Sequence, residues 1–171
     1  MSTNCKEERL FEAASTGNID EVKRLVDCGV NPNIQELEHN RTPLHYAALH
    51  GHPEVVKFLL EHGANPNIQD MFVWTPLHFA AEYGHFDVVK LLLEHGANPN
   101  VQDYGGVTPL HFAVEGCNVD VARILLDRGA DPTIRDNKGR TPLELGRGCK
   151  KEFIEELMRI SNGTIVQEEP C

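Results

Sequence analysis

The segment Thr75-Pro-Leu-His-Phe-Ala-Ala81 belongs to a set of four segments spaced 33 residues apart. The other three are Thr42-Pro-Leu-His-Tyr-Ala-Ala48, Thr108-Pro-Leu-His-Phe-Ala-Val114 and Thr141-Pro-Leu-Glu-Leu-Gly146. A second motif keeps this period and occurs at 59–67, 92–100 and 125–133, with a degenerate copy at 25–33. Its first full copy reads Leu59-Leu-Glu-His-Gly-Ala-Asn-Pro-Asn67. A fixed period of this length indicates one supersecondary unit stacked on copies of itself.

Each unit carries the signals of two short helices. The Thr of Thr-Pro-Leu-His can cap the first helix, and Pro at the first helical position has no amide hydrogen to leave unpaired. In Thr141-Pro-Leu-Glu144 these positions form a capping box. Glycines then break the chain between the helices and end the second helix, where a left-handed residue is needed. The glycines between the two helices are Gly17, Gly51 and Gly84, and those at the end of the second helix are Gly29, Gly63, Gly96 and Gly129.

The two motifs resemble the ankyrin repeat, whose unit is a β-turn followed by two antiparallel helices. The resemblance covers about residues 6–160 and implies an all-α solenoid of five helix-turn-helix repeats joined by β-turn or hairpin loops. We expect repeats at about 6–36, 37–69, 70–102, 103–135 and 136–160, within a single domain over 1–161. The acidic segment 162–171 is expected to be a flexible tail.

The second helices of the outer repeats differ from those of the inner repeats. Inner copies are apolar at five positions, such as Val55, Val56, Phe58, Leu59 and Leu60. In the first repeat, Glu21 and Arg24 replace the first and third of these positions, and in the last repeat Glu155 and Arg159 replace the second and fifth. Terminal repeats need a polar outer face. We therefore expect the array to begin and end within this chain, with no catalytic domain and no enzymatic activity.

The charge balance disfavours polyanionic partners. The 171 residues include 16 Lys and Arg and 26 Asp and Glu, which gives a formal net charge of −10. Binding to nucleic acid or anionic membranes relies on Lys and Arg, so we expect neither. The first residues lack an apolar stretch and no segment reaches the roughly 18 apolar residues of a membrane span. These features predict a cytoplasmic protein, or a nuclear one in a eukaryote.

The cysteines and histidines predict no cofactor and no metal site. The five cysteines lack a CxxC pair, so we expect reduced thiols rather than a disulfide framework, with Cys117 and Cys149 as sequence drift in inter-helix turns. His45, His78 and His111 belong to Thr-Pro-Leu-His, and the resemblance implies that they link turn and helix through hydrogen bonds. No nucleophile elbow, phosphate loop or HExxH motif is present, so catalytic residues are not expected.

The resemblance also implies a partner-binding surface on the concave face, formed by the turn tips and the first helices. The third repeat departs most from the pattern, because Asp70-Met-Phe-Val-Trp-Thr75 stands where the fifth repeat has Asp136-Asn-Lys-Gly-Arg-Thr141. Exposed aromatic residues and Met often mark interfaces. Our candidate partner-binding residues are Arg41, Leu49, His50, Met71, Phe72, Trp74, Glu82, Tyr83, Tyr104, Val107, Glu115 and Arg140. Among them, Phe72, Trp74, Tyr83 and Tyr104 are predicted to form a central anchor.

The leading hypothesis is therefore an adaptor, scaffold or inhibitor that binds a partner protein, which the sequence does not identify. One alternative is a small ligand stacked on Trp74 and Tyr83, and another is a bacterial effector acting on a host protein. Phe72 or Trp74 could instead pack against neighbouring tips such as Arg41 or Tyr104. A monomer is expected, with self-association through the aromatic patch as the alternative. Asn67 and Asn100 resemble positions that cytosolic hydroxylases modify in animal ankyrin repeats.

Overall fold

The computed structural model describes residues 3–161, which form ten α-helices and one short 3-10 helix. The first helices of the successive pairs are α1 (Thr3–Thr16), α3 (Pro43–His50), α5 (Pro76–Glu82), α7 (Pro109–Glu115) and α9 (Pro142–Leu145). The second helices are α2 (Ile19–Asp27), α4 (Pro53–Glu61), α6 (Phe86–Glu94), α8 (Val119–Asp127) and α10 (Lys151–Ser161). The 3-10 helix η1 (Gly146–Gly148) directly follows α9. The predicted all-α class is confirmed.

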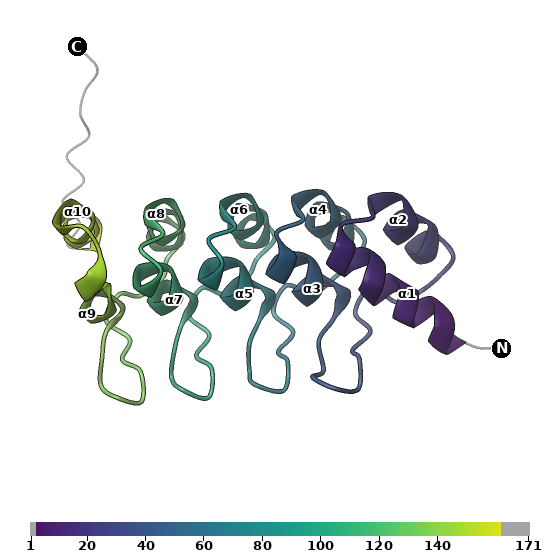
Figure 1. The fold of residues 1–171 in the computed structure, drawn as a ribbon, viewed down its shortest axis with the longest axis horizontal. Coiled ribbons are helices and arrows are strands. Elements are labelled where there is room, and N and C mark those ends of the chain that lie inside the picture. Colours follow the sequence, from purple (N-terminus) through teal and green to yellow (C-terminus); the bar gives the residue numbers. More distant parts are fainter. Residues whose placement is uncertain (1–2, 162–171) are drawn as a thin grey trace, which may run out of the picture.

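The helix pairs stack side by side into an elongated array. Figure 1 shows α2, α4, α6, α8 and α10 in one layer, the other helices in a second layer, and long loops projecting from the side of the second layer. Each first helix packs on the first helix of the next pair, and each second helix packs on the next second helix. The predicted solenoid is therefore confirmed, whereas its division into repeats at the residue boundaries given above stays a prediction.

The predicted threonine cap is confirmed at α3, α5, α7 and α9, and at the first three of these helices it includes a histidine. The Thr42 hydroxyl accepts the His45 N–H, while Nδ1 of His45 accepts the Thr42 N–H at 3.0 Å. Nε2 of the same ring lies 3.1 Å from the Trp74 carbonyl oxygen, in the loop of the next pair. His78 and His111 repeat both contacts, and Glu144 closes the last cap. One buried side chain thus closes its own helix and holds the neighbouring loop.

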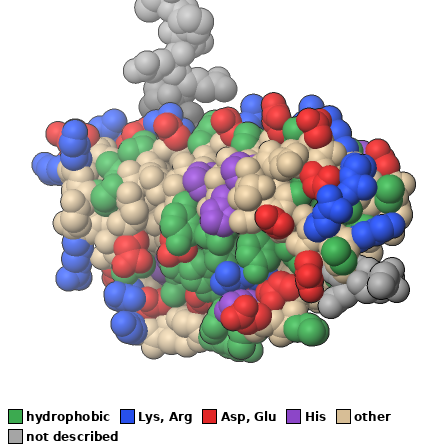
Figure 2. Space-filling model, turned by 45° about the vertical axis from the view of Figure 1, so that its right-hand side comes forward, with side chains coloured by type: hydrophobic (Ala, Val, Ile, Leu, Met, Phe, Trp, Pro, Cys, Tyr) green, Lys and Arg blue, Asp and Glu red, His purple; other side chains and the backbone are tan. Residues whose placement is uncertain are grey.

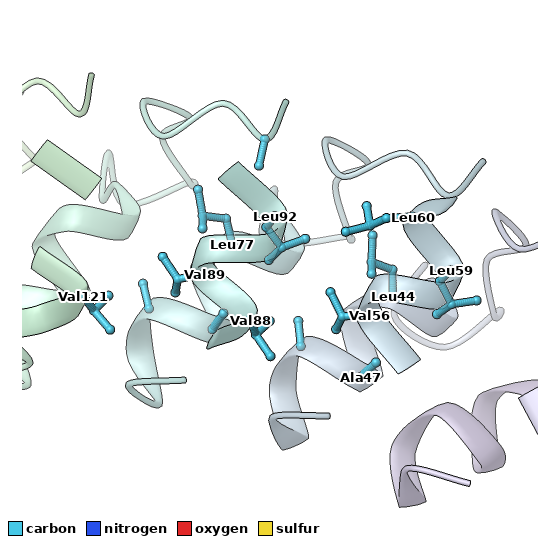
Figure 3. Packing of buried hydrophobic residues seen from close by; sticks show 14 of the residues in the cluster. Leu44, Ala47, Val56, Leu59, Leu60, Leu77, Val88, Val89, Leu92 and Val121 are labelled. Atoms are coloured by element: carbon cyan, nitrogen blue, oxygen red, sulfur yellow. The ribbon is translucent and has the colours of Figure 1, made fainter. Parts of the chain in front are cut away.

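The core runs without interruption through the array. Leu44, Leu77 and Leu110 of the first helices and Leu59, Leu92 and Leu125 of the second helices are almost wholly buried. Figure 3 shows how Leu44, Leu59, Leu77 and Leu92 and their neighbours Val56, Val88 and Val89 point into the space between successive pairs. Because each apolar face is covered by the next pair, the fold depends on contacts between pairs that are adjacent in the sequence.

The outer second helices have the polar positions that the sequence predicts. Arg24 of α2 is exposed, and Glu21 pairs with both Arg9 and Arg24. Glu155 and Arg159 of α10 are exposed, whereas Leu157 on the same helix is buried. α1 begins at Thr3, three residues before the predicted start of the first repeat near Lys6.

The prediction that all cysteines are reduced thiols is wrong for Cys117 and Cys149, which form a disulfide. Their separation of 32 residues is close to one period, so the stacking brings them to the same level of adjacent pairs with 5.5 Å between Cα atoms. Cys5 and Cys28 are exposed free thiols. The predicted tail at 162–171 lies outside the described residues. Among residues 3–161, no helix has the length and apolar character needed to cross a membrane.

Candidate functional site

A groove of about 450 Å³ lies where α5 meets the loops that precede α5 and α7. Its lining residues are Arg41, Phe72, Trp74, Phe79, Glu82, Tyr83, Asp103 and Tyr104. We call it the aromatic groove, because five of these eight side chains are Phe, Trp or Tyr. On the face drawn in Figure 2, hydrophobic side chains form a continuous patch with acidic and basic side chains beside it.

The rim of the aromatic groove is apolar and open to solvent. Tyr104 is 72% exposed, Tyr83 is 56% exposed and Phe72 is 44% exposed. Large aromatic side chains are usually much more buried than this, and clusters of exposed apolar surface often mark interaction sites. The three rings come from two different loops and the end of α5, so the stacking of neighbouring pairs creates the rim.

Trp74 forms the floor of the groove. Its ring centroid lies 4.8 Å from those of both Phe79 and Phe112, and its indole N–H donates to Asp103 at 3.0 Å. Trp74 is therefore only partly exposed, and its predicted role as an anchor for a partner or as a platform for a small ligand stays a prediction. The physical reason for its partial burial is that the indole reaches the carboxylate of the next loop, 29 residues along the chain.

Arg41 makes the equivalent link one repeat earlier. Its Nε donates to the Asp70 carboxylate at 3.2 Å, and its guanidinium carbon lies 4.7 Å from the centre of the Phe79 ring. The guanidinium is thus held between a buried carboxylate and an aromatic face. Arg41 and Trp74 both tie a loop to the aspartate of the following loop, which fixes the width of the groove.

The tip that carries Phe72 is held in a tight turn. One oxygen of the Asp70 carboxylate accepts the N–H groups of Phe72 and Trp74, both at 2.9 Å. Val73 between them has a φ of 66°, in the left-handed region that a β-branched residue rarely adopts. The corresponding turns place Gly106 and Gly139 in this conformation. The Asp70 turn thus presents Phe72 at the groove with a strained residue beside it.

Two predicted charged residues lie in an adjoining depression of about 450 Å³, lined by Glu115, Gly139, Arg140, Glu144, Leu145 and Arg147. Arg140 is paired with Asp136, with 2.7 Å between its terminal nitrogen and the carboxylate. Burial raises the pKa of the Glu82 carboxyl, and the negative charge of Glu115 raises it further. The two glutamates are therefore close enough to repel each other along this face.

The structure gathers most of the predicted site residues but not all of them. Arg41, Phe72, Trp74, Glu82, Tyr83 and Tyr104 line the groove, while Glu115 and Arg140 line the adjoining depression. Four predicted residues line neither. The backbone carbonyl oxygens of Leu49 and Val107 lie at the rings of His85 and His78, respectively. His50 is exposed and lies beside His52. Met71 is also exposed, and its N–H donates to the His39 carbonyl oxygen.

Two residues that line the groove, Phe79 and Asp103, are absent from the set predicted from the sequence. Phe79 belongs to the repeated Thr-Pro-Leu-His-Phe motif. This residue is only 4% exposed, and it lines the groove. Asp103 occupies the turn position of Asp70 and accepts the N–H groups of Gly105 and Val107. The 33-residue period could have placed both next to Trp74. Trp74 and Asp103 lie one period after Arg41 and Asp70, which form the equivalent contact.

Two groups with metal-binding or modification chemistry already have structural partners. In the part of the chain that the structure describes, Glu36, Glu38 and His39 can bring ligand atoms within 4.8 Å of one another. The Glu36 carboxylate, however, accepts the N–H groups of His39 and Arg41 and so closes the longer loop before α3. The Asn67 and Asn100 amides donate to the carbonyl oxygens of Gly96 and Gly129 in the following repeats, at 3.0 Å each.

These features define an α-helical repeat solenoid with an exposed apolar groove. A family model described as ankyrin repeats (3 copies) matches residues 2–70 and 69–136, which is more than half of the chain. The chain therefore belongs to the ankyrin-repeat family, and the resemblance noted in the sequence is confirmed. Ankyrin repeats are generally protein-interaction modules. No curated protein matches the chain significantly.

Proposed function

We propose that this chain is a non-catalytic binding module that docks a partner protein on its loop and first-helix face, with the aromatic groove at the centre. The observation that carries the proposal is the exposed rim of Phe72, Tyr83 and Tyr104 around a packed floor. Tyr, Trp and Phe are enriched at interface hot spots because they bury a large area with few rotatable bonds.

The rigidity of the groove supports the same proposal. Its floor is fixed by the Trp74–Asp103 hydrogen bond and its edge by the Arg41–Asp70 ion pair. A surface that is already ordered loses little conformational entropy on binding. The rim is therefore available to a partner without rearrangement of the scaffold.

The test is affinity capture from a lysate of the source organism, with the captured proteins identified by mass spectrometry. The groove variant Phe72→Ala/Tyr83→Ala/Tyr104→Ala removes the rim and leaves Trp74 in place, because loss of Trp74 would also loosen the fold. A control variant, Phe86→Ala/Met158→Ala, removes exposed apolar side chains that lie on second helices. All three proteins must first show the same melting temperature.

We expect the wild type and the control to capture a common protein that the groove variant loses. Truncation of a hot-spot residue typically costs about 2 kcal/mol or more, which is roughly a thirtyfold loss of affinity. Equal capture by the groove variant would refute a binding site at this groove.

A further inference from the structure

Two of the arginines that line the aromatic groove and the adjoining depression, Arg41 and Arg140, are already neutralised within the chain. Arg41 is held by Asp70 and covers the Phe79 ring. Arg140, at the adjoining depression, is held by Asp136 through both Nε and a terminal nitrogen. Neither side chain can turn to an acidic partner without leaving a buried carboxylate unpaired, which is costly.

The glutamates of this face have no such partners. Glu82 ends α5 and Glu115 ends α7, at corresponding positions of successive repeats. Within residues 3–161, neither carboxylate forms a salt bridge. Glu82 is half-buried at the wall of the groove, next to the exposed Tyr83. Unpaired negative charge therefore lies directly beside the apolar rim.

This arrangement constrains what can cover the groove. An apolar side chain seated on Phe72 and Tyr83 removes water from Glu82, and the desolvation of an unpaired carboxylate opposes binding. A cation delivered together with the apolar side chain offsets that cost and also reduces the repulsion between Glu82 and Glu115. Lys and Arg can do this, because their aliphatic stems pack on aromatic surface while the charged end reaches a carboxylate.

We propose that the aromatic groove and the Glu82–Glu115 pair together recognise a partner segment in which a Lys or Arg lies next to a large apolar side chain. This inference rests on the proposed docking function and specifies the chemistry of the docked segment. The overall charge of −10 favours approach of a basic segment from a distance, while the glutamate pair determines where its cation lies.

The experiment selects binders from a phage library of random 12-residue peptides against the immobilised full chain. Enriched peptides are synthesised, and their dissociation constants are measured for the wild type and three variants. The charge variant is Glu82→Gln/Glu115→Gln. A matched control, Glu54→Gln/Glu152→Gln, changes the net charge equally at exposed positions on α4 and α10. The groove variant Phe72→Ala/Tyr83→Ala/Tyr104→Ala is the third.

We expect enriched peptides to contain Lys or Arg within a few residues of an aromatic or large aliphatic residue. The affinity of these peptides for the charge variant should be about tenfold lower than for the wild type, as expected for loss of a close charge pair. Their affinity for the matched control should stay within about twofold of the wild-type value. Enrichment of acidic or uncharged peptides, equal binding to the charge variant, or no enrichment would overturn the inference.

The groove variant separates this inference from the proposed function. Peptides that lose binding to the groove variant but bind the charge variant normally would leave the docking site in place and refute the role of the glutamates. Peptides that bind both variants normally would refute both proposals.

Discussion

At the scale of single residues, the buried histidines of the helix caps make stability depend on pH. Burial lowers the pKa of His45 to about 4 and that of His78 to about 4. Nδ1 of each ring accepts a threonine N–H, so protonation there would break the cap. In the unfolded chain an imidazole has a pKa of about 6.5. The folded state therefore binds protons less readily, and its stability falls as the pH drops from about 6.5 towards 4.

We expect each of these two histidines to remove about 2 kcal/mol from the free energy of unfolding between pH 7 and pH 5. Urea unfolding at both pH values measures this loss. The His78→Gln variant should be less stable than the wild type at pH 7, because it loses the cap, but should lose less stability on acidification. An identical pH-dependent loss in the variant would contradict the assignment.

Val73 gives a second prediction at this scale. A left-handed conformation costs a non-glycine residue about 1–2 kcal/mol, and Gly106 and Gly139 occupy the corresponding turns. Val73→Gly should raise the free energy of unfolding by about 0.5–1 kcal/mol, since the greater freedom of glycine in the unfolded chain offsets part of the gain. Thermal unfolding provides the measurement. Val107→Gly, at a neighbouring tip without a positive φ, should lower stability instead.

At the scale of elements, the turns between paired helices show what the sequence could and could not reveal. Gly51 and Gly84 were predictable from the local motif, and their positive φ values agree. The contacts across these turns were not visible in the local motif, because they join residues about one period apart. His85 lies against Gly51, where an added Cβ would approach its ring to 2.6 Å, and Asn118 lies against Gly84 at 2.7 Å.

The disulfide joins the last two turns between paired helices for the same geometric reason. Cys117 stands where earlier turns have glycine, and Cys149 of the next pair bonds to it. A search for closely spaced cysteine pairs misses this arrangement, whereas comparison across one period finds it. Trp74 was likewise recognised as unusual, but its packing depends on Asp103, which the stacking of adjacent loops brings within reach.

This disulfide should hold the last helix pair on the array. It closes a segment of about one repeat, and loops of this length contribute roughly 2–4 kcal/mol to stability. Reduction with dithiothreitol should therefore lower the melting temperature and accelerate hydrogen exchange first in α10. Cys117→Ser/Cys149→Ser should reproduce the effect without reductant, and Cys5→Ser/Cys28→Ser should not. An unchanged melting temperature after complete reduction would show that packing alone holds α10.

At the scale of the whole molecule, stability follows from the linear stacking of the helix pairs. A central pair contacts a neighbour on each side, whereas α10 packs on α8 and α9 alone among the principal helix contacts. In a one-dimensional array of this kind, damage at an end can be confined there, while damage in the centre uncouples both sides. The chain contains a single tryptophan, Trp74, and it lies in the central part of the array.

This position allows the central and terminal unfolding to be measured separately. Leu92→Ala and Leu157→Ala remove the same atoms from almost fully buried sites in α6 and α10, and such substitutions cost about 2–5 kcal/mol. For Leu92→Ala, the urea transitions seen by Trp74 fluorescence and by far-ultraviolet circular dichroism should shift together. For Leu157→Ala, circular dichroism should show an early loss of helix while the fluorescence midpoint stays near that of the wild type. Equal shifts of both signals in Leu157→Ala would mean that the array unfolds as one cooperative unit, because the loss of packing at its end would then have reached the central groove.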